Sequence, residues 1–507
     1  MNVLCDRLMT GGMEEYGPKG ANLYDWRSDW YLPEKYVVGC LAESWEITAD
    51  KLVFHIRPGV YWSGMSINPV MEAREVTAED LAFNLNRILE GPDGEGTKAG
   101  AGIVAMDWVE SIYDEDTHTL VIETKYYNPA WFIRLYTTGW NFLIAPESIE
   151  AGPEEWENIV GTGPFVLTER SPGVSLTYEP NPLYWRKTTI NGKEYQIPFV
   201  DKLVLPVIKD EATVMAAVRT GVIDHFAAGT WVYAGTLAKT NPEILQVPCG
   251  LGGLWGVCIK CNKPPFDDKD VRRAVVTGTD LDTISRTAIG REWELHWPTR
   301  GEGHVELEEL SPELRAQYEY DPETAREMLA EAGYPDGFPV KLVTSNRFPV
   351  LGSIAELLAS QWERDLSVDV EIEVIDSSIF WPVTQEREAE WDLWLEWHGA
   401  HNAIHDFSLH YLTDAAGNFN YYSNPAFDEK FNESKRMFDA VDREKLEKEE
   451  SLMLIEASLC VPFPYHFTYT FYWPWIKNYH GELYEFMRDP PYEFWWIDQE
   501  LKAEMGY

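Results

Sequence analysis

The stretch that decides the fold is LWGVCIKCNKPPFDDKDVRRAVV, which runs from Leu254 to Val276. It opens as an apolar strand, and Pro264-Pro265 then stops that strand, because proline lacks an amide proton and restricts the residue before it. Asp267 or Asp268 is placed to cap a following helix. The apolar face of that helix would carry Val271, Ala274 and Val275. A strand that is redirected near mid-chain predicts the point where one globular lobe gives way to another.

Length and composition support two lobes. The chain has 507 residues, 45% hydrophobic and 14% aromatic, whereas single cores stop growing at roughly 250–300 residues. No apolar run approaches the ~20 residues of a membrane-spanning helix, so a soluble chain is expected. The formal net charge of -42 repels phosphate backbones and anionic lipid, which argues against binding to nucleic acid or to a membrane surface.

Cysteine usage predicts neither a disulfide scaffold nor a cofactor. Six cysteines are too few to staple a chain of this size. Cys258 and Cys261 form one CxxC motif, but no second CxxC and no nearby histidine completes a zinc set. We expect the cysteines to be buried or disulfide-paired, and we expect no cofactor. The six are Cys5, Cys40, Cys249, Cys258, Cys261 and Cys460.

Apolar periodicity along the chain predicts alternating strands and helices, as in an α/β protein. A strand is expected over 51–56, and Thr77 to Asp80 matches a helix-capping signature. Asp321-Pro322 predicts another helix start, with Gly333 at its end. Two later strands follow, and one of them is expected to direct Trp391, Leu393, Leu395 and Trp397 to one face.

Several segments, taken together and in order, resemble the extracytoplasmic solute-binding proteins of the peptide, nickel and oligosaccharide class of ABC importers. Single motifs are weak, but their order across most of the chain is specific. They are LAESWEITADKLVFHIRPGVYW (41–62), VTAEDLAFNLNRIL (76–89), GTGPF (161–165), NPLYWRK (181–187), FVDKLVLPVIKDEATVMAAVRTGVID (199–224), PPFDDKDVRRAV (264–275), YDPETAREMLAEAGYPDGFP (320–339) and NYYSNPAFDEKFNES (420–434).

The resemblance implies a two-lobe α/β fold of the periplasmic-binding-protein type II, with an extra subdomain in the first lobe. The first lobe would comprise residues 1–258 and 464–507, with the subdomain at about 49–160, and the second lobe 259–463. Prolines interrupt a second apolar run at CVPFPYHFTYTF (460–471), where the family's chain returns to its first lobe. Two such crossings make a hinge that suits closure over a ligand.

The resemblance also implies an extracytoplasmic, monomeric protein that captures an oligosaccharide, oligopeptide or similar polar solute for an ABC permease. The family's export signal and first strand are missing before Val3, so we expect a truncated chain or a start codon assigned too late. No nucleophile elbow, zinc-protease motif or phosphate loop is present. An enzyme is therefore not expected, although acidity and tryptophan content leave a secreted carbohydrate-active enzyme as an alternative.

Aromatic residues beside polar loops are the best candidates for ligand contact, since aromatic faces stack on sugar rings and apolar side chains. For any single tryptophan a core position is the more common case. Trp397 is favoured because it ends a buried strand. The full set of candidates is Trp397, His398, His401, Asn402, Trp255, Trp231 and Tyr233.

The loop after Trp397 carries two further indications about the ligand. In dipeptide-binding relatives the matching segment has an Asp that pairs with the ligand's amino terminus, and Ala400 stands there in this chain. High aromatic content and this loss slightly favour sugar over peptide. Alternatively, His398, His401 and His405 would bind nickel or another metal chelate, because imidazole suits such ions.

Overall fold

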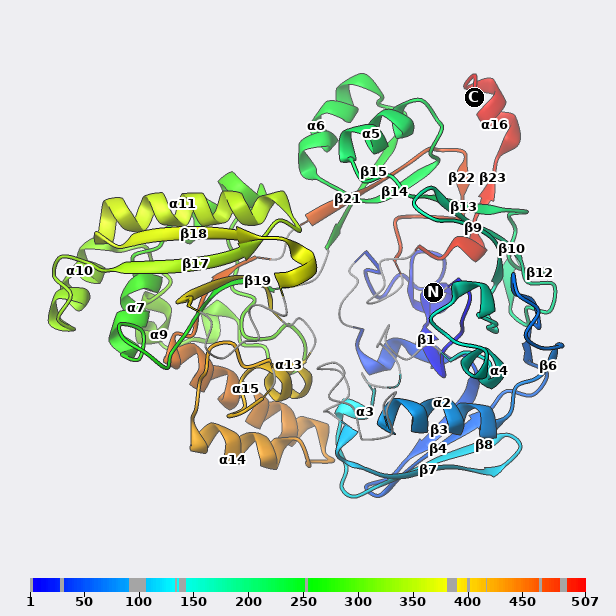
Figure 1. The fold of residues 1–507 in the computed structure, drawn as a ribbon, viewed down its shortest axis with the longest axis horizontal. Helices are drawn as coiled ribbons and strands as arrows, with labels where there is room; N and C mark the ends of the chain where they lie inside the picture. Colours follow the sequence, from blue (N-terminus) through cyan, green and yellow to red (C-terminus); the bar gives the residue numbers. More distant parts are fainter. Residues whose placement is uncertain are drawn as a thin grey trace. The chain divides into compact units, whose positions relative to one another are not determined.

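The computed structural model describes residues 3–27, 32–90, 106–132, 135, 143–250, 254–380, 390–398, 402–415, 417–464, 467–483 and 490–507. The chain divides into two compact units. The first unit comprises Met1–Tyr127, Trp131–Leu251 and Phe467–Tyr507, and the second Asn128–Ala130 and Gly252–His466. Both units combine helices with sheets, as the α/β prediction requires (Figure 1).

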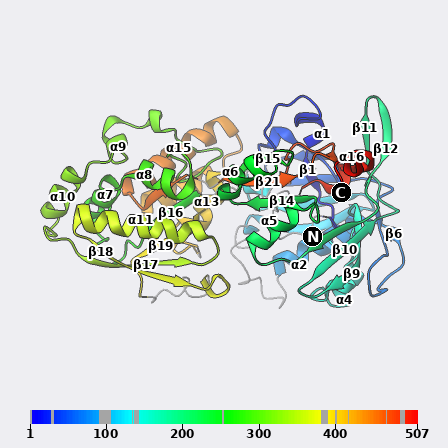
Figure 2. The ribbon, with the colours of Figure 1, turned by 90° about the horizontal axis from the view of Figure 1, so that it is seen from above.

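The second unit is built on a five-stranded sheet of order β18-β17-β19-β16-β20. Its strands are β16 (Leu254–Ile259), β17 (Pro339–Ser345), β18 (Asp369–Ile375), β19 (Leu393–His398) and β20 (Cys460–Phe463). β17 runs parallel to β18 and β19, whereas β16 is antiparallel to both β19 and β20. The long helix α11 (Pro349–Leu366) packs along β17 and β18 (Figures 1 and 2).

The stretch from Leu254 to Val276 forms the predicted strand and helix. β16 ends at Ile259, and α7 (Lys269–Thr277) begins after Asp268, whose carboxylate accepts a hydrogen bond from the Asp270 amide at 2.8 Å. Val271, Ala274 and Val275 are fully buried in the core of the second unit. The pattern of apolar residues and a capping aspartate therefore predicted this strand-to-helix turn correctly.

The other helices of the second unit surround this sheet and a smaller helical core. α10 begins at Pro322 after the predicted Asp321 cap, and Gly333 follows it with a φ of 96°. The remaining helices are α8 (Leu281–Ile284), α9 (Pro312–Ala316), α10 (Pro322–Glu331), α13 (Ala403–His410), α14 (Pro425–Ser434) and α15 (Ala440–Ala457).

The predicted shared face is confirmed for Leu393 and Leu395 but is wrong for Trp391, and the side chain of Trp397 lies outside the described residues. Leu393 and Leu395 pack into the main core under α11, but Trp391 lies before β19 and joins Trp394 and Phe380 in a separate cluster. Trp394 is fully buried as well. Because β19 is a central strand with both faces covered, alternation along it does not separate an inner from an outer face.

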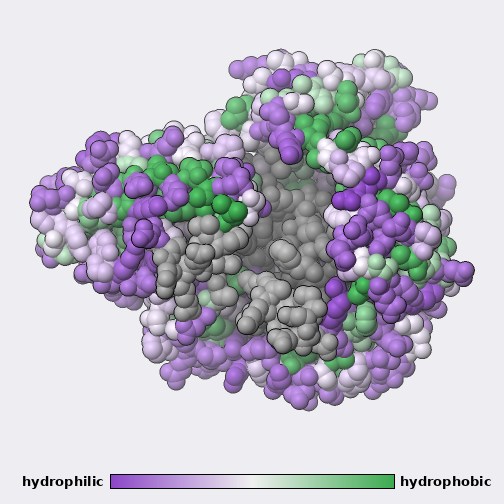
Figure 3. Space-filling model, in the orientation of Figure 1, coloured by the Kyte–Doolittle hydropathy of each residue, from purple (hydrophilic) through white to green (hydrophobic). Residues whose placement is uncertain are grey.

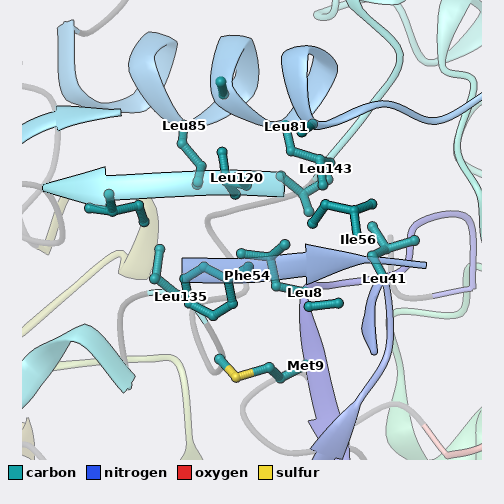
Figure 4. Close-up of a cluster of buried hydrophobic side chains, with 14 of the residues drawn as sticks. Leu8, Met9, Leu41, Phe54, Ile56, Leu81, Leu85, Leu120, Leu135 and Leu143 are labelled. Atoms are coloured by element: carbon teal, nitrogen blue, oxygen red, sulfur yellow. The ribbon is translucent and has the colours of Figure 1, made fainter. Parts of the chain in front are cut away.

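In the first unit, helix α2 (Ala78–Glu90) covers a four-stranded antiparallel sheet of order β3-β4-β8-β7. Leu81 and Leu85 of α2 point toward Leu120 of β8, with Phe54 and Ile56 of β4 in the same core (Figure 4). The predicted strand and capping signature are both confirmed. The strands are β3 (Ala42–Ile47), β4 (Lys51–Ile56), β7 (Val109–Asp116) and β8 (Thr119–Thr124).

A second sheet of the first unit draws its middle strand from the end of the chain. β21 (Phe467–Tyr472) lies between β14 (His225–Gly229) and β15 (Leu245–Gly250), antiparallel to both. The other elements of this unit are β1 (Met9–Gly11), α1 (Met13–Tyr16), β2 (Val37–Gly39), β5 (Tyr61–Trp62), β6 (Arg74–Glu75), α4 (Pro146–Glu150), β9 (Phe165–Ser171), β10 (Ser175–Pro180), β11 (Lys187–Ile190), β12 (Lys193–Gln196), β13 (Leu203–Pro206), α5 (Glu211–Arg219), α6 (Trp231–Thr240), β22 (Ile476–Lys477), β23 (Trp496–Ile497) and α16 (Gln499–Glu504), and the short helix α3 spans Ala130–Phe132.

The surface and the cysteines agree with the composition. Among the residues that Figure 3 colours, hydrophilic ones predominate on this face and hydrophobic ones gather in patches. All six cysteines are free thiols, and all but the half-buried Cys261 are buried. Burial without pairing is one of the two outcomes predicted for them.

Candidate functional site

The carboxyl ends of β17 and β19 bring several side chains to one edge of the sheet in the second unit. The two strands are parallel, with Thr344 beside Leu395, so the next residues, Ser345 and Glu396, are also neighbours. Antiparallel β16 begins at this same edge with Leu254 and Trp255. In open α/β sheets, ligands bind outside the carboxyl ends of parallel strands. This edge is therefore the candidate site.

An arginine supported by two aromatic rings lies at this edge. Arg347 is exposed, and its guanidinium carbon lies 5.1 Å from the centroid of the Phe348 ring. The Phe348 ring in turn lies 5.4 Å from the Trp255 ring, at an interplanar angle of 44°. A planar guanidinium on an aromatic surface can donate two parallel hydrogen bonds to a carboxylate while the rings contact apolar groups.

Beneath Arg347 lies a buried hydroxyl and carboxyl pair. Ser345 Oγ donates to Glu396 Oε2 at 2.7 Å and accepts from the Arg347 amide at 3.2 Å. Ser345 and Glu396 are 2% and 1% exposed. Burial raises the pKa of the Glu396 carboxyl, while the Ser345 hydrogen bond and the Arg347 charge oppose that rise. An acidic group next to the cation will affect how strongly the site attracts anions.

The aromatic candidates from the sequence lie in both units. Trp255 is 5% exposed and belongs to the core of the second unit, where it supports Phe348. Trp231 begins α6 in the first unit and is 42% exposed. Tyr233, two residues further along α6, is half-buried against the core of that unit. Contact of any of these residues with a ligand stays a prediction.

The polar candidates surround the start of α13. Trp397 and His398 are the last two residues of β19, but their side chains lie outside the described part of the chain, as does the whole of His401. Asn402 is the N-cap of α13, and its side chain accepts a hydrogen bond from the His405 amide at 3.1 Å. His405 itself is buried. Asn402 thus has a structural role that its sequence position had not indicated.

Sequence reasoning did not single out Arg347, Phe348, Ser345 or Glu396. Arg347 is one of 42 lysines and arginines, and Glu396 is one of 84 acidic residues. A signal existed, since Arg347 comes two residues after a strand-like segment whose carboxyl end would lie at a ligand-binding edge. Recognising it required knowing that β17 and β19 are parallel neighbours.

The described residues contain neither a metal-binding cluster nor a membrane-spanning helix. Within these ranges, no group of three or more His, Cys, Asp or Glu side chains is arranged to hold a metal ion. None of the described helices is both long and apolar enough to cross a bilayer.

Comparison with known proteins gives consistent matches over most of the chain. Residues 36–420 match the bacterial extracellular solute-binding proteins, family 5 Middle. Heme-binding protein A of Haemophilus influenzae is 25% identical, over 87% of this chain and 81% of its own length. Periplasmic oligopeptide-binding protein OppA of the same species is also 25% identical, over 87% of this chain and 82% of its own length.

A solved structure matches over nearly the whole chain. It is the ABC transporter-associated periplasmic binding protein DppA from Helicobacter pylori in complex with the peptide STSA. The match has a TM-score of 0.76 and 20% identity, and covers 98% of this chain and 92% of that chain. This likeness confirms the predicted two-lobe α/β fold.

Proposed function

Because the chain belongs to the bacterial extracellular solute-binding proteins of family 5, we propose that it captures short peptides outside the cytoplasm and delivers them to an ABC permease. The ligand is bound and released without chemical change. The relatives favour a peptide, since one is named an oligopeptide-binding protein and another was solved with a bound peptide.

The observation that carries the proposal is the exposed Arg347 on its aromatic support. A peptide has a terminal carboxylate beside an apolar or aromatic side chain, and Arg347 with Phe348 matches both groups. Charge-assisted arginine–carboxylate pairs are among the stronger hydrogen bonds in proteins. A neutral sugar offers this arginine no comparable partner, so the arginine outweighs the preference for sugar drawn from the sequence.

The sequence-predicted contacts remain part of this proposal. Trp397 and His398 are the last two residues of β19, which ends at the candidate edge, and His401 and Asn402 follow in the chain. Trp231 and Tyr233 would contribute from the other lobe. The lobes would comprise 1–258 with 464–507, and 259–463. The two chain crossings at these boundaries would act as the hinge of a monomer that closes over its ligand.

The first experiment identifies the ligand. The protein is purified without denaturation, and whatever it releases on unfolding is analysed by mass spectrometry. Peptides with free carboxyl termini are expected. An oligosaccharide, or a metal chelate whose binding is lost when His398 and His401 become Ala, would contradict the peptide proposal.

The second experiment tests the arginine. Arg347→Ala should weaken binding of peptides with a free carboxyl terminus by about tenfold or more, since a charge-assisted pair contributes roughly 1.5–3 kcal/mol. Arg364→Ala is the matched control, because Arg364 is an exposed arginine of α11 that pairs with its neighbour Asp365. Small-angle scattering should show ligand-dependent compaction in the wild type and in Arg364→Ala. Equal affinity of both variants for peptide would refute the assignment of Arg347.

A further inference from the structure

The Ser345 hydroxyl connects two strands to the backbone of Arg347. It donates a hydrogen bond to Glu396 Oε2 at 2.7 Å and accepts one from the Arg347 amide at 3.2 Å. The three residues therefore form one chain of hydrogen bonds that runs from β19 through the end of β17 to the arginine. Ser345 and Glu396 are both buried, so water does not substitute for either partner.

Asn346, the residue between Ser345 and Arg347 in the chain, is hydrogen-bonded to the other neighbouring strand, β18. The Asn346 amide donates to the carbonyl of Ile375, at the end of β18, at 3.1 Å. The Asn346 side chain accepts from the Ser377 amide at 2.9 Å. The turn that carries Arg347 is thus tied to β18 on one side and to β19 on the other. Of the two attachments, only the one to β19 reaches Arg347 itself.

We propose that Glu396, acting through Ser345, is a positioning residue that fixes the backbone of Arg347 and thereby sets the preference of the site for solutes with a carboxylate. The inference rests on the proposed function, because it takes Arg347 as the anchor of the ligand's carboxylate. A guanidinium gives two parallel hydrogen bonds only when its plane is fixed, and a small misplacement costs much of that gain.

The surroundings of Glu396 support this role over a purely packing one. Its neighbour on β16 is Gly256, which has no side chain to bond to it. Its hydrogen bond to Ser345 is short, and the charge of Arg347 acts on it from the end of β17. An apolar residue would fill a buried strand position without the desolvation cost of a carboxyl group. The hydrogen bond that Glu396 accepts from Ser345 explains why a carboxyl group stands at this position.

The experiment measures the preference of the protein for peptides with a free carboxyl terminus over peptides with an amidated terminus. An equimolar library of random di- to pentapeptides is offered with free carboxyl termini and, separately, with amidated termini. Native mass spectrometry gives the bound amount of each, and their ratio is the preference. Loss of folded protein lowers both amounts equally and leaves the ratio unchanged, so the ratio reports positioning of Arg347 and not stability.

The Ser345 variants test the bridge. Ser345→Ala should reduce a preference of about tenfold to about twofold, because Arg347 keeps its charge but loses its fixed orientation. Ser345→Thr retains the hydroxyl and should restore the preference. Thr344→Val is the matched control, since Thr344 Oγ1 also bonds β17 to β19, at 2.8 Å to the Leu395 carbonyl, without bonding to Arg347. It should keep the wild-type ratio.

The Glu396 variants separate the hydrogen bond from the charge. Glu396→Gln keeps an acceptor for Ser345 and removes the charge, so the preference should be retained or rise by up to about threefold as Arg347 is no longer opposed. Glu396→Met removes the acceptor at similar volume and should lower the preference as Ser345→Ala does.

Two results overturn the inference in distinguishable ways. If the wild type prefers the free-carboxyl library but Ser345→Ala and Glu396→Met keep that ratio, the positioning role is refuted and the proposed function stands. If the folded wild type binds both libraries equally, or neither, then Arg347 is not a carboxylate anchor and both conclusions fail together.

Discussion

At the scale of single residues, two buried glutamates in α15 make the stability of the folded chain depend on pH. Glu447 and Glu450 are 1% and 0% exposed. Burial raises their pKa from about 4.5 to about 7 and about 8. Arg443, whose Nε lies 3.2 Å from Glu447 Oε1, opposes the rise at Glu447. Glu302 and Glu444 add to the rise at Glu447. At Glu450 the Ser434 hydrogen bond and the Lys430 charge, both from α14, oppose the rise, whereas Glu447 and Glu449 add to it.

The sign of the pH dependence follows from proton binding. Above their usual pKa of about 4.5 the unfolded chain releases these protons, while the folded chain keeps them up to about pH 7 and 8. The stability that they contribute is therefore fully present below about pH 4.5 and is lost as the pH rises through 7 and 8. We expect the melting temperature of the wild type to fall between about pH 6 and pH 9, with Glu450→Gln falling less.

Glu456→Gln is the control for that measurement. Glu456 also lies on α15, but its side chain is 58% exposed and pairs with Lys269 on the surface. Its removal should leave the pH profile of the melting temperature unchanged. A wild-type profile that is flat over this range, or that rises with pH, would show that the two buried groups are ionised in the folded chain.

Only some residues of the candidate site could be singled out from the sequence. Trp255 could be noticed because it starts the strand before the double proline. Arg347, Ser345 and Glu396 acquire meaning only because parallel pairing of β17 and β19 places residues about fifty positions apart within hydrogen-bonding distance. Sequence position carries no record of that pairing, since register is set by the whole sheet.

At the scale of a single element, the start of α2 depends on one carboxylate. Asp80 accepts hydrogen bonds from the Thr77 amide at 3.0 Å, from Trp62 Nε1 at 2.9 Å, and from both terminal nitrogens of Arg74 at 2.8 Å. Burial would raise the pKa of the Asp80 carboxyl, but these donors hold it below its usual value. Removing the carboxylate takes this acceptor from the Thr77 amide and from the buried Trp62 Nε1, whereas Arg74 keeps its bonds to Glu147.

Asp80→Ala should therefore destabilise α2 and the sheet beneath it by about 2–4 kcal/mol. Hydrogen–deuterium exchange of the α2 amides, followed by mass spectrometry, measures the effect locally. Glu79→Ala, at the exposed neighbouring position, should change exchange by less than about 0.5 kcal/mol. Equal protection of α2 in both variants would mean that the cap contributes little.

Elements whose signals are local could be predicted from the sequence. The cap and apolar face of α7, the capping residues of α2 and the Asp321-Pro322 start of α10 all use residues within one turn of each other. Trp391 could not be placed in the same way. Its environment depends on Phe380 and Phe419, which reach it from other parts of the chain. The local pattern of residues predicts the type of an element better than it predicts which residues its side chains will contact.

At the scale of the whole molecule, the formal net charge of -42 is the dominant electrostatic fact. Like charges spread over a folded surface repel one another, and salt screens that repulsion. We expect the melting temperature to rise by several degrees between about 10 mM and 300 mM sodium chloride, as the Debye length falls from about 30 Å to about 6 Å. Sucrose at matched osmolality should not reproduce the salt dependence, and a melting temperature that falls with salt would contradict the expectation.

The division into two units followed from length, from the proline-marked stops and from the resemblance of ordered segments to one family. Those signals suffice for the architecture because a family's fold is encoded redundantly along its chain. They do not identify the solute, because a binding site depends on a few side chains presented by a shared scaffold.

Both units receive a strand from the last stretch of the chain. β20 lies beside β16, with Cys460 opposite Cys258, and β21 fills the gap between β14 and β15. While the ribosome is still translating, β16 has one open flank, and β14 and β15 have no strand to join them. Pairing between strands so far apart in the sequence slows folding. Neither sheet is complete until the last stretch of the chain has been synthesised.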